Sequence, residues 1–133
     1  MNTETGQTIL LVEDDTVVAG LIRFYLEREG FAVRHAADGN EALREFDRPQ
    51  LPDLVILDVL LPYHNGHELL ANLRARPAGA NVPAVMLTSS DREKDVVKGL
   101  SGGANDYLAK PFRPAEAVAR IRNLLQSTAK AKA

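Results

Sequence analysis

Five side chains that could do chemistry stand at the ends of short apolar segments in this 133-residue chain. Glu13 and Asp14 follow one apolar run, Asp58 follows another, and Thr88 and Lys110 end two later ones. Three carboxylates and a single ammonium group leave an excess of negative charge, which a divalent cation would neutralise. Ligands that are all oxygen suit a hard ion, so these residues indicate a Mg²⁺ site.

Asp58 is the best candidate for a nucleophile among these residues. It ends the third apolar run, which should form the central strand, and Lys110 should reach it. A carboxylate nucleophile that accepts a phosphoryl group becomes an aspartyl phosphate. Mg²⁺, Lys110 and the hydroxyl of Thr88 would then supply the charge compensation and positioning that phosphoryl transfer requires.

The apolar runs themselves predict a parallel sheet. Runs at 9–12, 54–57 and 84–87 are too short for helices and continuously apolar, as strands buried on both faces are. A more mixed segment at 32–36 is typical of an edge strand, and a shorter one at 107–109 completes five. In open α/β sheets, sites form beyond the carboxyl ends of the strands, so the five side chains should meet at one edge.

Helical patterns separate these strands. The apolar spacing of a helix recurs at 18–25 and 118–125, and Asp38–Glu41 and Ser90–Glu93 have the spacing of a capping box. Asp15 is placed to start the first helix. Five strands alternating with five helices predict the α/β class, with a doubly wound five-stranded parallel sheet and helices on both of its faces.

The composition narrows the function classes. The chain is 45% hydrophobic and 26% charged with a net charge of −2, as expected for one globular domain without the basic field of a nucleic-acid or membrane binder. It has no cysteine, which excludes disulfides, thiolate metal sites and cysteine nucleophiles. The sequence shows no membrane-span pattern and no apolar signal region, so we expect a cytoplasmic protein.

Four motifs, in this order, resemble the receiver domain of bacterial two-component response regulators: ILLVEDD, LVILDVLLPYHNG, VMLTSS and GANDYLAKPF. The resemblance covers about 8–126 and implies the flavodoxin-like receiver fold. The resemblance is to single-domain receivers of the chemotaxis kind. Residues 1–133 would then form one receiver domain, with flexible ends at 1–7 and 127–133.

The resemblance also implies a role for individual residues. Asp58 would be the phosphoacceptor and Lys110 the lysine that binds the phosphoryl group, with a cis peptide bond to Pro111. The Mg²⁺ ligands would be Glu13, Asp14, Asp58 and the backbone carbonyl of Leu60. Thr88 and Tyr107 would form the switch, and Val96, Leu100 and Tyr107 the output surface.

A receiver is a phosphorylation-dependent signalling switch in a phosphorelay. By resemblance, a sensor histidine kinase or a histidine phosphotransfer protein would phosphorylate Asp58, and a downstream protein would read the result. We expect no direct contact with nucleic acid or membrane, and a monomer or a weak phosphorylation-dependent dimer. The chain would not be an enzyme for outside substrates, because it would catalyse only its own phosphorylation and dephosphorylation.

The short sequence after Gln126 predicts a stand-alone receiver. The alternative is a receiver fragment of a larger DNA-binding response regulator, since RPAEAVARIRNLL resembles the last helix of receivers fused to winged-helix domains. In that group, charged pairs hold an active dimer, and Asp106 and Arg120 fit one such pair.

Other classes remain to be weighed. A Mg²⁺-dependent aspartate-nucleophile phosphatase of the haloacid-dehalogenase kind needs a second Asp two residues after the nucleophile, where this chain has Leu60. A flavodoxin-like cofactor module needs a Ser/Thr/Gly-rich phosphate loop after the first strand, where this chain is acidic. The third alternative is a docking protein that has the receiver fold but is never phosphorylated. Each residue alone also has an ordinary structural explanation, such as a helix cap or a solvated lysine.

Overall fold

The computed structural model describes the backbone of residues 5–88 and 102–132, and the side chains of these residues up to Ser127. Its elements, in chain order, are β1 (Thr8–Val12), α1 (Thr16–Arg28), β2 (Ala32–Ala36), α2 (Gly39–Phe46), β3 (Leu54–Asp58), α3 (Gly66–Ala75), the 3₁₀ helix η1 (Pro77–Gly79), β4 (Ala84–Thr88), β5 (Asp106–Ala109) and α5 (Pro114–Lys132). The fourth predicted helix, with its Ser90–Glu93 cap, lies outside the described residues.

The five strands form one parallel sheet in the order β2-β1-β3-β4-β5. Both expectations about strand position are therefore confirmed, since β2 is an edge strand and β3 is central. The strand order changes direction between β1 and β3, because the chain leaves β1 for β2 on one side and returns to β3 on the other. Sites in open α/β sheets form at such a reversal point, beyond the carboxyl ends of the strands.

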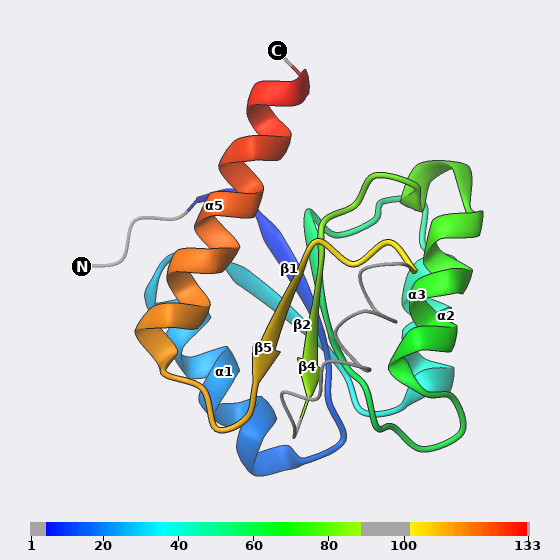
Figure 1. Ribbon diagram of the computed structural model, residues 1–133, viewed down its shortest axis with the longest axis horizontal. Coiled ribbons are helices and arrows are strands. Elements are labelled where there is room, and N and C mark those ends of the chain that lie inside the picture. Colours follow the sequence, from blue (N-terminus) through cyan, green and yellow to red (C-terminus); the bar gives the residue numbers. More distant parts are fainter. Residues whose placement is uncertain (1–4, 89–101, 133) are drawn as a thin grey trace.

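Helices cover both faces of the sheet, with α1 and α5 on one side and α2 and α3 on the other (Figure 1). Along β1, Ile9 and Leu11 pack against α1 and α5, whereas Leu10 and Val12 pack against α2 and α3. All four side chains are fully buried. The alternation explains why the sequence of this strand is continuously apolar, because each of its faces meets a helix layer.

Helix α1 begins as the sequence predicts but carries two apolar faces. The carboxylate of Asp15 caps the helix, and its Oδ1 accepts hydrogen bonds from the backbone N–H groups of Val17 at 2.9 Å and Val18 at 3.1 Å. The buried face consists of Ala19, Ile22 and Leu26. Leu21 shares the helical apolar pattern but is 48% exposed, and the other exposed members of its face are Val17 and Phe24.

The segments around β3 and α3 pack very closely. Helix α3 begins at Gly66, after an Asn65 cap whose Oδ1 accepts from the N–H of Glu68 at 2.9 Å. A Cβ atom on Gly66 would overlap the backbone oxygen of Asp58. The N–H of Gly66 also donates to the carbonyl of Val59 at 2.8 Å. The start of α3 therefore abuts the end of the central strand, which only glycine allows.

Arg74, at the end of α3, joins three parts of the chain. Its guanidinium donates to the carbonyl of Gly103 from Nε at 3.0 Å and from Nη2 at 2.8 Å, and to the carbonyl of Gly79 from Nη1 at 2.8 Å. Nη2 also donates to Oδ1 of Asn105 at 3.1 Å, and the same oxygen accepts from the N–H of Ala84 at 2.9 Å. Partial burial lowers the pKa of Arg74. These contacts hold the chain just before β5 against α3 and the start of β4.

Helix α5 is the longest helix among the described residues. It continues to Lys132 and projects beyond the sheet (Figure 1). The predicted flexibility of 127–133 stays a prediction. Near its middle, Nη1 of Arg120 lies 2.7 Å from Oδ1 of Asp106 on β5, so this predicted dimer pair is joined within one chain. No helix in the described parts of the chain has the length and apolar character to cross a bilayer.

Candidate functional site

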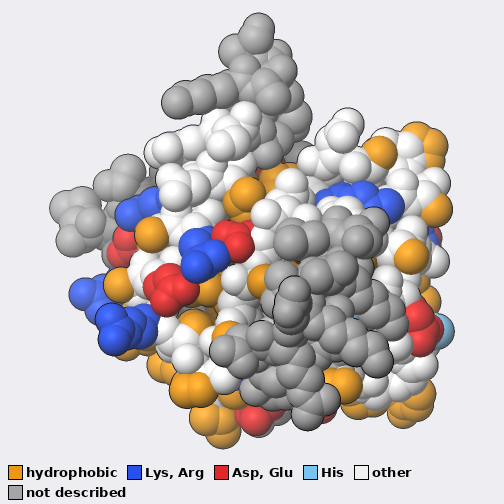
Figure 2. Space-filling view, viewed as in Figure 1, with side chains coloured by type: hydrophobic (Ala, Val, Ile, Leu, Met, Phe, Trp, Pro, Cys, Tyr) orange, Lys and Arg blue, Asp and Glu red, His pale blue; other side chains and the backbone are white. Residues whose placement is uncertain are grey.

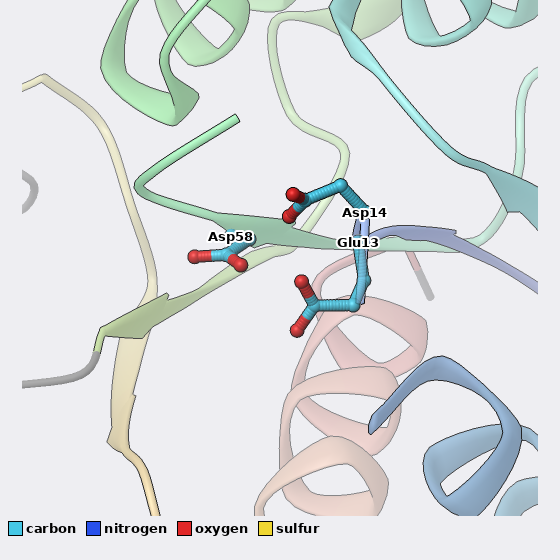
Figure 3. Close-up of side chains that lie close together, drawn as sticks. All are labelled: Glu13, Asp14 and Asp58. Carbon is cyan, nitrogen blue, oxygen red and sulfur yellow. The ribbon is translucent and has the colours of Figure 1, made fainter. Parts of the chain in front are cut away.

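The three carboxylates singled out in the sequence meet at the carboxyl edge of the sheet. Glu13 and Asp14 leave the end of β1, Asp58 ends β3, and one carboxylate oxygen from each lies within 4.8 Å of the others (Figure 3). Glu13 is fully buried and Asp58 is 6% exposed, whereas Asp14 is exposed. Among the side chains that the structure describes, these form the one group of three potential metal ligands.

Lys110 connects two of these carboxylates. Its ammonium nitrogen lies 2.6 Å from Oε1 of Glu13 and 2.9 Å from Oδ2 of Asp58, which confirms that it reaches the candidate nucleophile. Its backbone N–H donates to the carbonyl of Thr88 at 2.6 Å, which fixes the chain after β5 to the end of β4. The peptide bond from Lys110 to Pro111 is cis, as the resemblance implies.

Burial governs the electrostatics of this group. Removal from water, reinforced by the neighbouring carboxylate of Asp58, raises the pKa of Glu13 to about 7, although Lys110 opposes the shift. Burial by itself would lower the pKa of Lys110, but its hydrogen bonds to Glu13 and Asp58 outweigh that effect and raise it. The lysine is therefore held as a cation, and the carboxylates still carry more negative charge than it neutralises.

The donor set fits Mg²⁺. All three candidate ligand side chains offer carboxylate oxygens, which a hard divalent cation prefers. Mg²⁺ keeps several water molecules when it binds to proteins, and the exposed Asp14 leaves one side of the group accessible to them. Glu13, Asp14 and Asp58 could therefore hold the ion, and the participation of the Leu60 carbonyl stays a prediction.

The carboxylate of Asp58 is held by two donors. Oδ2 accepts from Lys110, and Oδ1 accepts from the backbone N–H of Leu60 at 3.1 Å. The side chain of Leu60 is 69% exposed and lies beside the acceptor in the chain. This nearly buried carboxylate is oriented for nucleophilic attack. The adjacent ammonium group can stabilise negative charge on the electrophile that it attacks.

The predicted switch residues lie on the next two strands. Thr88 ends β4 and is 3% exposed, and β4 is the direct neighbour of the strand that carries Asp58. Tyr107 on β5 is half-buried, pairs with Met86 in the sheet register and packs against the core under α2 and α3. Their roles as switch residues stay predictions. Val96 and Leu100, the other two members of the predicted output surface, lie outside the described residues.

The sequence reasoning missed two residues that contact the site. Gly66 makes room for the backbone of Asp58 at the start of α3. His35 on β2 places its Nε2 atom 2.7 Å from the backbone oxygen of Glu13. A glycine after a strand-end turn gives some signal, because close backbone approach favours glycine. His35 gives none, because it stands inside the edge strand and its contact depends on the register between β1 and β2.

Comparison with known proteins supports the resemblance to receiver domains that the sequence motifs indicate. The sequence profile described as response regulator receiver domain matches residues 9–122. The alkaline phosphatase synthesis transcriptional regulatory protein SphR of Synechococcus elongatus is 46% identical over 126 residues, which cover 89% of this chain and 48% of that protein. The chain spans about half the length of the curated relatives it matches.

Solved receiver structures have the same fold. The receiver domain of a Francisella response regulator is 32% identical, with a TM-score of 0.84 over 92% of this chain and 98% of that one. The receiver domain of a Pseudomonas aeruginosa sensor histidine kinase, solved with a magnesium ion coordinated in its active-site cleft, is 37% identical, with a TM-score of 0.83 over 90% and 98%. With the profile match and the observed sheet order, these similarities show that this chain belongs to the family of response regulator receiver domains.

Proposed function

We propose that this receiver domain is a phosphorylation switch in which Asp58 accepts a phosphoryl group at a Mg²⁺-dependent site. The observation that carries the proposal is the contact between Lys110 and Asp58, 2.9 Å long, inside a group of carboxylates that fits a divalent cation. When bound, Mg²⁺ would neutralise charge on the carboxylates and on the incoming phosphoryl oxygens.

The side chains around Asp58 have distinct tasks in this reaction. An oxygen of Asp58 attacks phosphorus, the bond from phosphorus to the donor's leaving atom breaks, and the leaving group departs with the bonding electrons. Lys110 stabilises the phosphoryl oxygens as an ammonium group. The N–H of Leu60 orients the carboxylate. The hydroxyl of Thr88 then moves toward the phosphoryl group and binds it. Tyr107, on the adjacent strand, turns inward in response, so the output surface populates its active conformation more often.

The proposed phosphodonor is a histidine kinase or a histidine phosphotransfer protein, and the proposed reader is a downstream protein. Because the chain spans about half of relatives such as a transcriptional regulatory protein, control of a DNA-binding domain in a longer chain is the second candidate output. In either case the domain acts on its own Asp58 and not on outside substrates. The surface of Val96, Leu100 and Tyr107 remains the predicted reading site.

The first prediction tests the acceptor directly. Purified protein is incubated with acetyl phosphate and Mg²⁺, and its intact mass is followed with time. We expect the wild type to gain one labile phosphoryl group and Asp58→Asn to gain none, because the amide has nearly the same shape but is a poor nucleophile. Asp47→Asn is the matched control, because that exposed acid pairs with Arg76 away from the site.

Two results would contradict the proposal. Labelling of Asp58→Asn at the wild-type rate would show that another residue is the acceptor. Continuous release of phosphate by the wild type, without a phosphorylated protein that survives the assay, would instead indicate a phosphatase acting on outside substrates.

A further inference from the structure

His35 makes a contact with the site that the proposed reaction has not used. It lies on β2, is half-buried, and its Nε2 atom is 2.7 Å from the backbone oxygen of Glu13. A carbonyl oxygen can only accept, so this hydrogen bond requires Nε2 to carry the proton. The ring therefore donates to the residue that begins the acidic group.

The contact lies just beyond the last backbone hydrogen bond between β1 and β2. Val12 pairs with Ala36 in the last register position of β1 and β2, and the N–H of Glu13 still donates to the carbonyl of Ala36 at 3.1 Å. The carbonyl of Glu13 lies one step beyond, in a residue with no exposed surface. A buried carbonyl requires a hydrogen-bond partner, and His35 supplies it.

This hydrogen bond also constrains the backbone that leads into Asp14. The carbonyl of Glu13 and the N–H of Asp14 belong to one planar peptide unit, so fixing the oxygen fixes the direction in which the chain enters Asp14. Asp14 lies between the end of β1 at Val12 and the Asp15 cap of α1, and so belongs to neither element. The peptide unit before Asp14 is held by His35, and the N–H after it, that of Asp15, donates to Oε2 of Glu13 at 3.4 Å.

We propose that His35 is a positioning residue of the cation site: by donating to the carbonyl of Glu13, it aims the carboxylate of Asp14 at the bound ion. The inference rests on the proposed function, since the ion is the Mg²⁺ that assists phosphorylation of Asp58. Residues that orient metal ligands without contacting the metal typically lower the metal affinity by about 10–100-fold when they are removed.

A matched pair of substitutions separates positioning from packing. His35→Gln keeps an N–H donor at the end of an unbranched side chain, and His35→Met has a similar shape without the donor. Mg²⁺ binding to the unphosphorylated protein is measured by calorimetry. We expect the Kd of His35→Met to rise by about tenfold, and that of His35→Gln to stay near the wild-type value. Arg34→Leu is the control, since Arg34 pairs with Glu45 and makes no contact with the acidic group in the described contacts.

The kinetics give a second readout. In His35→Met, phosphorylation by acetyl phosphate should need more Mg²⁺ for half-maximal rate but reach the wild-type rate at saturating Mg²⁺. An unchanged Kd in His35→Met would overturn the inference. Equal weakening in the Met and Gln variants would overturn it as well, because a purely structural histidine would be equally intolerant of both. If the wild type neither binds Mg²⁺ nor is phosphorylated, the proposed function itself fails.

Discussion

Glu13 is the residue in which the conflict between stability and function is most acute. Its carboxyl group is fully buried, contacts Lys110 at 2.6 Å and lies beside Asp58. Burial raises the pKa of Glu13 to about 7, from an ordinary value of 4.5. A carboxyl whose pKa is higher in the folded chain stabilises the fold fully below pH 4.5 and loses that contribution as the pH rises through about 7.

Glu13→Gln should reveal this cost. Without Mg²⁺, the variant's free energy of unfolding should increase relative to that of the wild type as the pH rises from 4.5 to 7. The reason is that Glu13 ionises in this range and the amide does not. The size of the change is on the order of 3 kcal/mol. Urea unfolding of both proteins across this range measures it, and the variant should also bind Mg²⁺ more weakly. A difference in stability that stays constant with pH would contradict the assignment.

The sequence predicted the acidic group and the lysine because each follows an apolar run, and parallel strands end at one edge. It could not predict which of them would be buried. Glu13 and Asp14 are adjacent and chemically alike, yet one is fully enclosed and the other exposed. That difference depends on where the peptide plane turns after β1, which in turn depends on contacts such as that of His35.

At the scale of the elements, the junction of β3 and α3 sets the position of the acceptor. Gly66 permits the helix to begin against the backbone of Asp58, and a Cβ atom there would also lie 3.0 Å from Cε of Met86. The methionine end can move, but the backbone oxygen of Asp58 belongs to the central strand. Any larger residue at position 66 must therefore displace either the helix or the acceptor.

Gly66→Ala should lower the free energy of unfolding by about 1–3 kcal/mol, the usual cost of overpacking, and slow phosphorylation by acetyl phosphate. Chemical unfolding and phosphorylation rates measure the two effects. Gly20→Ala is the matched control, because a Cβ atom there meets nothing within 4 Å and α1 continues through it. That control should gain about 0.5–1 kcal/mol from the better helix propensity of alanine. Equal stability of the two variants would refute the crowding argument.

The five strands and the alternation with helices were predictable, because apolar runs and caps give local signals, whereas the 3₁₀ helix η1 was not predicted. The two apolar faces of α1 were not predictable. A helical apolar pattern shows that some face is buried, but the direction in which the helix lies on the sheet decides which one. The neighbours of α1 thus bury Ala19 and Ile22 and leave Leu21 exposed.

At the scale of the whole molecule, the exposed apolar residues of α1 lie next to the phosphorylation edge. The helix follows directly after the acidic segment, and Val17, Leu21 and Phe24 are 80%, 48% and 59% exposed. Hydrophobic side chains gather along the lower left of Figure 2, where Figure 1 places α1. Contiguous exposed apolar surface is typical of a protein-binding site, and a protein phosphodonor must contact the edge that carries Asp58.

Replacing both Leu21 and Phe24 by Ser should therefore separate two kinds of phosphodonor. Transfer from a phosphorylated histidine kinase that serves the wild type should slow by about tenfold or more, as expected for loss of apolar interface anchors. Labelling by acetyl phosphate should stay unchanged, because the small donor needs no docking surface. Both rates can be followed on gels that resolve the phosphorylated protein. Parallel losses with the two donors would show that the helix supports the site and not the partner.

Arg74 has a consequence on an evolutionary time scale. It ties the carbonyl of Gly103 and the side chain of Asn105 to α3, and Thr88 is buried where β4 ends. The side chains of Arg74 and Asn105 thus determine where the chain enters β5. Among descendants of this protein that acquire new partners, we therefore expect Arg74 and Asn105 to persist under purifying selection.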